Sequence, residues 1–466
     1  MIKRQKLKEK ITSLFPFKIN LEQEACITSI VDFVNTIGNQ SIFILKGYAG
    51  TGKTTIVSKL VKALPVIAKR SILMAPTGRA AKILSKYANK SSSTIHKKIY
   101  WIRINKSGNT FITLKENTHI NTIFIVDEAS MIADKSDLGF GNRCLLDDLI
   151  KYVYSGIGCK LILIGDTAQL PPVNLDISPA LEEEKLEINY NKKVISKELT
   201  EVVRQKKDSL IIENATHIRK RIKNNIYTYP KIKTNHQIMR IDNGEELQEA
   251  LEYSYNNEGI NNTTILCRSN KRANLYNQQI RTRIISQEDD ISAGDIMMVV
   301  RNNYYWLDEN SKAGFIANGE IIKIISIRER FERYDFHFAK ALIKMIDYPE
   351  EEFEVLLLLD TLQSKNSSIT YEQYQKLYKN IESNYKGEKE IKKKIKEDKF
   401  FNALQIKFAY SITCHKSQGG QWKNVFIDLG YFKKEMLDKS YLRWLYTAIT
   451  RSSKRVYLIN FNNNFF

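Results

Sequence analysis

Short apolar runs alternate with amphipathic stretches along the first 200 residues. Each run is rich in β-branched residues and leads into glycine, proline or acidic residues, and then into a segment with helical spacing. Runs that are apolar on both faces are typical of strands buried in a parallel sheet. The pattern therefore predicts an α/β lobe whose strands lie at 42–45, 72–75, 123–126 and 161–164.

A second set of such runs begins at 264–267 and resumes at 425–429 and 456–459. The same alternation predicts a second lobe with a parallel sheet, interrupted between its halves. We expect the fold class to be α/β with two P-loop-type lobes. The expected boundaries are 1–197 for lobe 1, 198–327 for the first part of lobe 2, 328–404 for an insert and 405–466 for the second part of lobe 2.

Two stretches break the alternation. Residues 328–404 mix aromatic and charged positions, as in Phe353-Glu354-Val355, and then become Lys/Glu-rich with helical character at 371–399. This predicts a small β subdomain with a helical excursion. Residues 99–114 alternate on either side of the turn sequence KSGN at 106–109. This predicts a β-hairpin inserted in lobe 1 at about 98–120.

The net charge of the chain says more about its partners than its length does. The chain has 466 residues, a 43 % hydrophobic fraction and a formal net charge of +20, from 72 Lys+Arg and 52 Asp+Glu. The length predicts two to four domains with ordinary cores. The positive excess indicates a polyanionic partner, either nucleic acid or an anionic membrane surface. A source organism with a Lys/Asn/Ile-rich proteome is the alternative explanation for this excess.

The cysteines, the histidines and the apolar runs bear on whether the protein is disulfide-bonded, zinc-binding, secreted or membrane-bound. The five cysteines are scattered without a CxxC pair, and the six histidines show no metal-ligand spacing. They predict neither a disulfide framework nor a zinc site. The basic N-terminal segment lacks the apolar core of a signal peptide, and no apolar run reaches membrane-spanning length. We expect a soluble, cytoplasmic protein without a membrane partner.

The segment GYAGTGKT at 47–54 follows a predicted strand and precedes an amphipathic stretch. This is the P-loop pattern in the context that it requires. Its glycines let backbone N–H groups approach phosphates, and the following helix N-terminus favours negative charge. Lys53 is expected to reach the β- and γ-phosphates, and the Thr54 hydroxyl to ligate Mg²⁺. The predicted nucleotide-binding set includes Gly47, Gly50, Gly52, Lys53, Thr54 and Thr55.

Acidic and amide side chains follow two other predicted strands. Asp127 and Glu128 end the strand at 123–126, and adjacent carboxylates there are costly unless they are used or solvated. Asp127 is expected to hold Mg²⁺, and Glu128 to polarise the attacking water. The alternative is a surface acidic pair. Gln169, in the segment GDTAQLPP at 165–172, is a candidate sensor of the γ-phosphate.

These motifs, in this order, resemble those of superfamily 1 helicases of the RecD/Dda-like group. The resemblance spans nearly the whole chain and implies two RecA-like lobes, ATP hydrolysis coupled to DNA unwinding, and ATP with Mg²⁺. It is carried by GYAGTGKTT (47–55), APTGRAAKIL (75–84), VDEASM (126–131), GDTAQLPPV (165–173), LTEVVRQ (199–205), TCHKSQGGQW (413–422) and YTAITRS (446–452).

The resemblance also implies residue roles. Gln23 matches an adenine-reading glutamine, although Ile19-Asn20 stands where the family more often has Leu-Thr. Arg204 and Arg451 match two arginines that reach the γ-phosphate from the second lobe. A guanidinium supplied in this way stabilises transition-state charge and is worth on the order of 10³–10⁵ in rate. A surface or salt-bridged arginine is the alternative at each position.

The same resemblance places single-stranded DNA across the tops of both lobes. Hydroxyls, backbone N–H groups and positive charge suit phosphate contacts that are blind to sequence. The two histidines in this set could instead cap helices or pack. The expected DNA-binding residues are Pro76, Thr77, Arg79, Thr94 and His96 in lobe 1, and Arg268, Asn270, His415, Lys416, Ser417 and Gln418 in lobe 2.

Direction of travel is implied by likeness alone. The HKSQG form at 415–419 resembles the members that run 5′→3′, and the insert at 328–404 matches their SH3-like accessory domain by position. We expect a monomeric motor with single-stranded DNA and strand junctions as partners, and possible replication or repair proteins beside them. Repair, recombination, replication restart and mobile-element maintenance stay open as pathways.

Three alternatives predict different sequences. A P-loop ATPase that remodels protein or protein–DNA complexes would lack the second-lobe motifs, which are present at 413–422 and 446–452. A motor subunit of a recombination or nuclease complex stays open, although no separate acidic nuclease cluster stands out. An inactive DNA-binding scaffold would lack Lys53, Glu128 or Arg451.

Overall fold

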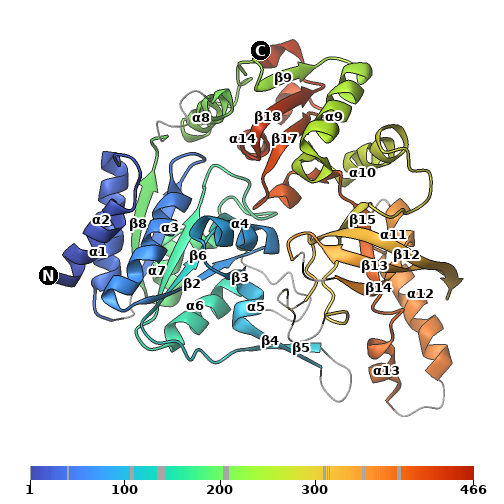
Figure 1. Ribbon diagram of the computed structural model, residues 1–466, viewed down its shortest axis with the longest axis horizontal. Helices are drawn as coiled ribbons and strands as arrows, with labels where there is room; N and C mark the ends of the chain where they lie inside the picture. The colour runs from blue at the N-terminus through green and yellow to red at the C-terminus, as the bar shows by residue number, and fades with distance from the viewer. Residues whose placement is uncertain are drawn as a thin grey trace.

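Three bodies make up the molecule in the computed structural model (Figure 1). Two contain parallel sheets with helices, and the third is a closed barrel with helices beside it. The structure describes residues 2–38, 41–104, 110–133, 143–202, 209–307, 311, 313, 315–348, 350, 352–364, 366, 368–385 and 390–466. The predicted pair of α/β lobes is confirmed.

Lobe 1 is built on a six-stranded sheet in which every pairing is parallel. The strands, in spatial order, are β3 (Ser92–Thr94), β2 (Arg70–Ala75), β6 (Thr122–Val126), β7 (Lys160–Gly165), β1 (Ser41–Gly47) and β8 (Lys193–Leu199). The helices are α1 (Ile2–Ser13), α2 (Leu21–Asn35), α3 (Lys53–Ala63), α4 (Gly78–Ala88), α5 (Ile95–Ile99), α6 (Leu145–Ser155) and α7 (Glu183–Tyr190).

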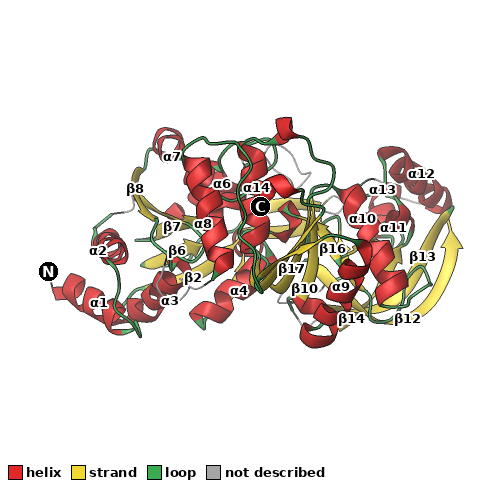
Figure 2. Ribbon diagram, turned by 90° about the horizontal axis from the view of Figure 1, so that it is seen from above, coloured by secondary structure: helices red, strands yellow, loops and turns green. Residues whose placement is uncertain are grey.

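Alternate residues of each central strand face opposite helix layers, which explains the continuous apolar runs. In β1, Phe43 and Leu45 pack with α1 to α4, whereas Ile42 and Ile44 pack with α5 to α7. Helices lie on both sides of the sheet when the molecule is seen from above (Figure 2). A strand covered on both faces needs apolar residues at every position. The four strands predicted for this lobe are therefore found, and β3 and β8 join them at the edges.

The predicted hairpin is also present. β4 (Tyr100–Ile104) pairs antiparallel with β5 (Thr110–Leu114), and the tip at 105–109 lies outside the described residues. At its base, the Trp101 ring is 52 % exposed and the Lys115 ammonium lies 4.4 Å from the ring centroid. The Tyr100 hydroxyl donates to Asp148 Oδ2 of the helix at 145–155 at 2.8 Å, which anchors the hairpin to lobe 1.

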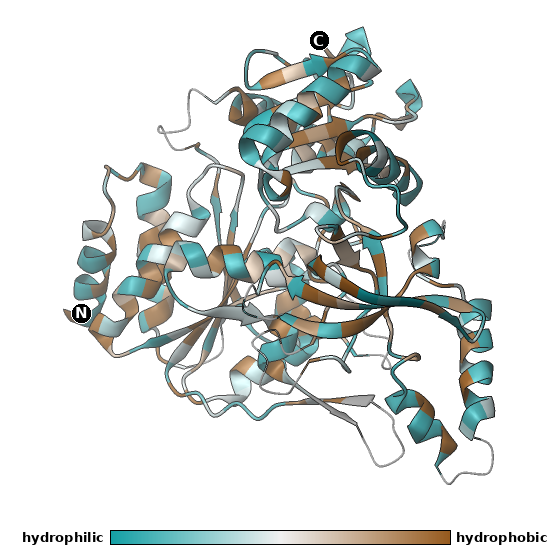
Figure 3. Ribbon diagram, turned by 45° about the vertical axis from the view of Figure 1, so that its right-hand side comes forward, coloured by the Kyte–Doolittle hydropathy of each residue, from teal (hydrophilic) through white to brown (hydrophobic). Residues whose placement is uncertain are grey.

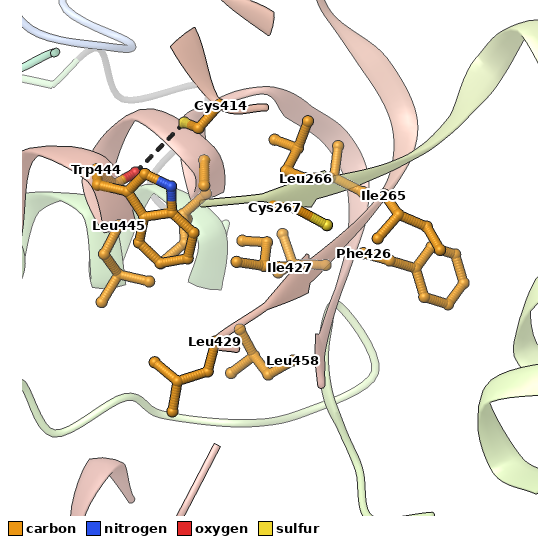
Figure 4. Close-up of a cluster of buried hydrophobic side chains, with 14 of the residues drawn as sticks. Ile265, Leu266, Cys267, Cys414, Phe426, Ile427, Leu429, Trp444, Leu445 and Leu458 are labelled. Atoms are coloured by element: carbon orange, nitrogen blue, oxygen red, sulfur yellow. Dashed lines mark hydrogen bonds between the residues drawn. The ribbon is translucent and has the colours of Figure 1, made fainter. Parts of the chain in front are cut away.

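Lobe 2 repeats the parallel arrangement with five strands. Their spatial order is β16 (Ser411–Thr413), β10 (Thr263–Cys267), β17 (Trp422–Asp428), β18 (Ser452–Ile459) and β9 (Ile238–Ile241). The helices are α8 (Leu210–Lys223), α9 (Gly244–Glu258), α10 (Asn270–Gln279) and α14 (Lys439–Thr450). Trp444 and Leu445 anchor α14 among the buried side chains of β10, β17 and β18 (Figure 4).

The third body is a closed five-stranded barrel, in keeping with the small β subdomain expected in lobe 2. It contains β11 (Ile296–Val299), β12 (Ile321–Arg333), β13 (Phe336–Met345), β14 (Glu352–Leu358) and β15 (Leu404–Phe408). Beside it lie α11 (Asp360–Gln363), α12 (Tyr371–Glu382) and α13 (Ile391–Glu397). Figure 3 shows hydrophobic positions gathered on the strands inside the bodies and hydrophilic ones along the outer helix faces.

The barrel extends beyond the insert expected at 328–404. Residue 328 lies within β12, and β11 starts 32 residues earlier, at Ile296. The antiparallel pairing of β11 with β15, for example Met297 with Phe408, closes the barrel. Short apolar runs such as β11 and β15 read alike in a barrel and in a parallel lobe, so only this pairing assigns them. None of the helices in the described ranges is long and apolar enough to cross a bilayer.

Candidate active site between the two lobes

The P-loop joins β1 to α3 at the carboxyl end of the lobe 1 sheet. Gly50 has φ of +80° and Gly52 has φ of +93°, a region that residues with a Cβ rarely adopt. Glycine therefore permits the curve that turns backbone N–H groups inward. The Nζ of Lys53, at the start of α3, donates to the carbonyl oxygens of Gly47 (2.6 Å) and Tyr48 (3.0 Å). Thr54 and Thr55 follow in the first turn of α3.

Asp127 and Glu128 follow β6 and stand beside the P-loop lysine. The Asp127 backbone N–H donates to the carbonyl of Met74, and the Glu128 N–H donates to Asp127 Oδ1 at 2.9 Å. Glu128 has φ of +53°, which is uncommon for a residue with a side chain and clusters at functional sites. Burial raises the pKa of both carboxyls, and the positive charge of Lys53 opposes that rise.

Arg451 brings a positive charge from lobe 2 to the same carboxyl. Its side chain follows α14, is only 6 % exposed, and donates to the carbonyl oxygens of Thr447 (3.2 Å) and Gly420 (3.3 Å). Burial is the main influence on the pKa of Glu128, and the guanidinium of Arg451 is the strongest of those that lower it. Cations from two lobes therefore act on one half-buried acid, although Lys53 and Arg451 lie 398 residues apart in the chain.

The structure describes two of the three remaining residues that were predicted to contact the nucleotide. Gln169 is buried, and no described group hydrogen-bonds its Oε1. Gln23 is also buried; its Nε2 donates to the carbonyl of Thr51 in the P-loop, at 3.3 Å, and its Oε1 caps α2. Both residues adjoin the cleft. Arg204 lies outside the described residues.

Hydrogen bonds join the lobes across this cleft. The hydroxyl of Tyr446, on α14, accepts from the backbone N–H of Ala49 in the P-loop at 2.9 Å. The same hydroxyl donates to Asp166 Oδ2 at 2.7 Å. One residue later, Thr447 Oγ1 accepts from the backbone N–H of Leu170 at 2.9 Å. Lobe 2 therefore contacts both the P-loop and the loop after β7.

The lobe 1 residues predicted to contact DNA are mostly engaged within the protein. Thr77 and Thr94 cap α4 and α5 by accepting from backbone N–H groups at 3.2 Å. The Arg79 guanidinium lies over the Trp422 ring, 4.3 Å from its centroid, in a contact between lobes. His96 packs edge-on against Phe315, and burial lowers the pKa of its imidazole to about 4. Pro76 precedes Thr77 and is half-buried.

The lobe 2 residues predicted to contact DNA divide into two groups. Ser417 is buried and donates to the carbonyl of Cys414, and Gln418 Nε2 donates to the carbonyl of Leu170 at 2.6 Å. These side chains fix the loop against lobe 1. The outward group comprises the exposed residues Arg268, Asn270 and His415 and the half-buried Lys416.

Known families match both lobes. The family described as an AAA domain matches residues 19–236, and the UvrD-like helicase C-terminal domain matches residues 408–459. The second match covers the segment that carries Tyr446 and Arg451. The ATP-dependent DNA helicase Dda of Enterobacteria phage T4 is 27 % identical over 64 % of this chain and 64 % of its own length. The chain is a superfamily 1 helicase of the RecD/Dda-like group.

Other proteins that resemble this chain match it over more of its length. The uncharacterized protein R530 of Acanthamoeba polyphaga mimivirus is 25 % identical over 94 % of this chain and 99 % of its own length. A crystal structure of Pif1 helicase from Bacteroides, in complex with ADP-AlF3 and ssDNA, covers 96 % of this chain and 94 % of that chain, with 16 % identity and a TM-score of 0.48.

The chemistry of the cleft fits ATP and Mg²⁺, which helicases of this group use. Lys53 supplies a phosphate-binding ammonium, and the backbone N–H groups at the start of α3 favour anions. The hydroxyl of Thr54 and the carboxylate of Asp127 are hard oxygen donors of the kind that Mg²⁺ prefers. The carboxyls of Asp127 and Glu128 are partly removed from solvent and need compensating positive charge, which Lys53 and Arg451 provide only in part.

Sequence reasoning missed the interlobe contacts of this helicase. Tyr446 lies within the quoted motif YTAITRS, but nothing in that string assigns its hydroxyl a partner. Arg219, on α8, was not singled out either, and its guanidinium lies 4.0 Å from the ring centroid of Tyr48 in the P-loop. Both contacts join residues more than 150 positions apart, so no local sequence signal could have revealed them.

Proposed function

We propose that this helicase is an ATP-driven motor on single-stranded DNA that moves 5′→3′ and unwinds duplex DNA as a monomer. The observation that carries the proposal is the shared cleft. Lys53 and Glu128 come from lobe 1 and Arg451 from lobe 2, and the charges of the two basic residues act on the carboxyl of Glu128. Hydrolysis would then depend on the relative position of the lobes, which is what a translocating motor requires.

Each residue of the cleft has a task in the proposed reaction. Lys53 binds the terminal phosphates, and Thr54 and Asp127 hold the metal. Mg²⁺, when bound, would neutralise charge on the phosphates. Glu128 orients the attacking water and accepts its proton, and Gln169 contacts the γ-phosphate. Arg451 stabilises charge that develops on the transferred group, which is worth on the order of 10³–10⁵ in rate.

We further propose that the outward group in lobe 2 provides direct phosphate contacts, together with the loop at Pro76 and Thr77. This group consists of Arg268, Asn270, His415 and Lys416. Arg79, Thr94, His96, Ser417 and Gln418 would act on DNA by holding their loops in shape, because their side chains are engaged with other parts of the protein.

Energy and direction complete the proposal. Opening one base-pair step costs about 1.4 kcal/mol on average. The free energy released by hydrolysis of one ATP is several times larger, so one ATP can drive at least one step. The 5′→3′ direction rests on the HKSQG form of the loop at 415–419. Stimulation by single-stranded DNA would follow if DNA brings this loop, and α14 with it, into place against lobe 1.

Two partial duplexes test the proposal, one with a 5′ overhang and one with a 3′ overhang, each with ATP and Mg²⁺. We expect unwinding of the substrate with the 5′ overhang and a rise in ATP hydrolysis when single-stranded DNA is added. Unwinding from the 3′ overhang alone would overturn the direction. An ATPase rate that single-stranded DNA leaves unchanged would overturn the motor.

A further inference from the structure

The hydroxyl of Tyr446 is the meeting point of three segments. It accepts from Ala49 N–H of the P-loop at 2.9 Å and donates to Asp166 Oδ2 at 2.7 Å. The residue itself belongs to α14 in lobe 2 and is 1 % exposed. The hydroxyl therefore uses its proton and a lone pair at once, on two different loops of lobe 1.

Hydrogen bonds within the turn at 166–169 connect Asp166 to Gln169. The carboxylate of Asp166 is 1 % exposed; its Oδ1 accepts from the backbone N–H of Ala168 at 2.9 Å. The carbonyl of Asp166 accepts from the backbone N–H of Gln169 at 3.3 Å. A buried carboxylate is costly without donors, and Tyr446 supplies the donor that comes from outside this turn. The turn that presents Gln169 is therefore held in part by a side chain of lobe 2.

The helix that carries Tyr446 ends at Arg451, and it is packed into the lobe 2 core. Trp444 and Leu445 are buried in that core, and Cys414 Sγ lies 3.6 Å from the carbonyl oxygen of Trp444 (Figure 4). A shift of α14 relative to lobe 1 would displace the Tyr446 hydroxyl and the Arg451 guanidinium together. The same shift would break the bond from Leu170 N–H to Thr447 Oγ1.

We propose that Tyr446 is a positioning residue for ATP hydrolysis, whose hydroxyl sets Gln169 and the P-loop in register with Arg451. Docking of α14 then delivers the guanidinium and orders the Gln169 turn in one movement. This inference rests on the proposed function, since it assumes that the cleft hydrolyses ATP. It assigns to Tyr446 no contact with ATP itself.

The substitution Tyr446→Phe tests the hydroxyl while keeping the ring. With saturating oligo(dT) as the DNA, we expect kcat for ATP hydrolysis to fall about 10- to 100-fold, the range for losing a hydrogen bond to a charged group. KM for ATP should stay within about twofold, because Lys53 and the P-loop backbone are intact. An unchanged kcat, or a rise in KM that accounts for the whole loss, would overturn the proposal.

Tyr441→Phe is the matched control. Tyr441 lies on the same helix and is 1 % exposed, but no described group hydrogen-bonds its hydroxyl. Its loss should leave kcat and KM unchanged. A fall in kcat equal to that of Tyr446→Phe would mean that helix packing, and not the hydroxyl bridge, is responsible, and would overturn the proposal.

A double-mutant cycle with Gln169→Ala separates positioning from general damage. If Tyr446 acts through Gln169, the double variant should have nearly the kcat of Gln169→Ala alone. If the fold-losses in kcat of the two single variants multiply in the double variant, Tyr446 does not act through Gln169. The wild-type control distinguishes the two levels of inference: a wild-type chain without DNA-stimulated hydrolysis contradicts the proposed function, whereas an active wild type with an equally active Tyr446→Phe contradicts only the role of Tyr446.

Discussion

The nucleotide cleft and the proposed DNA path use their motif residues in different ways. In the cleft, Lys53 and Glu128 of lobe 1 and Arg451 of lobe 2 lie close enough for their charges to act on one another. Along the DNA path, Arg79 stacks on Trp422 and Gln418 bonds the carbonyl of Leu170. Motif residues in the cleft thus bring charges from both lobes to one acid, whereas several in the path contact only other parts of the protein.

The difference follows from what each region binds. Phosphoryl transfer needs a few groups aimed at developing charge in a water-excluded place. Binding of a DNA backbone without regard to sequence spreads over many exposed contacts, each of modest strength. A motif that borders DNA therefore needs only some of its side chains on the outside, and the others can fix the loop that presents them.

The largest expected effect is on the cleft alone. Lys53→Ala should lower kcat for ATP hydrolysis by about 10²–10³-fold or more, the scale for losing one donor to transition-state charge. Affinity for oligo(dT), measured by fluorescence anisotropy without nucleotide, should stay within about twofold. Lys62→Ala, an exposed lysine on the same helix, is the control and should change neither quantity. A loss of DNA affinity in Lys53→Ala would contradict the separation between the nucleotide cleft and the proposed DNA path.

A buried carboxyl beside the DNA path gives the next effect. Glu320, immediately before β12, packs against Gly78 at the start of α4, and burial raises its pKa to about 8 despite nearby Arg79. Between pH 4.5 and 8 the folded state therefore holds one more proton than the unfolded state. Stability falls as pH rises through this window and is level above it.

Glu320→Gln should remove this pH dependence, because the amide resembles the neutral acid. Its melting temperature should exceed that of the wild type at pH 8.5 by an amount equivalent to about 3–5 kcal/mol, because each unit of pKa difference is worth about 1.4 kcal/mol, and the gap should close near pH 5. Glu329→Gln, at an exposed position of β12, should show no such pattern. A gap that is the same at both pH values would mean that titration of Glu320 does not cause it.

The smallest effect should separate two neighbours in one loop. Lys416→Gln should weaken oligo(dT) binding about three- to tenfold and reduce the slope of log affinity against log salt by about 0.7, the value for one lost phosphate contact on a single strand. Gln418→Ala should leave that slope unchanged and lower DNA-stimulated ATPase instead, because its side chain bonds the loop after β7. Equal slopes in the two variants would contradict the division into outward and inward residues.

Short sequence motifs were sufficient to predict much of the fold, and they nominated the candidate residues of the cleft. The buried strands of both lobes were recognisable because a strand covered on both faces must be apolar throughout. Lys53, Asp127 and Glu128 were recognisable because the P-loop and the acidic strand end each occupy a few consecutive residues. The barrel limits were missed because β11 and β15 are closed by pairing across more than 100 residues.

The sequence by itself determined that the chain carries a P-loop, two parallel lobes and an ordered set of helicase motifs, since each depends on neighbours in the chain. Only the tertiary structure decided how those motifs meet. It placed the Tyr446 hydroxyl between Ala49 and Asp166, and it turned Arg79 onto Trp422. Such contacts depend on how two lobes pack, and packing brings together residues hundreds of positions apart, which no local pattern records.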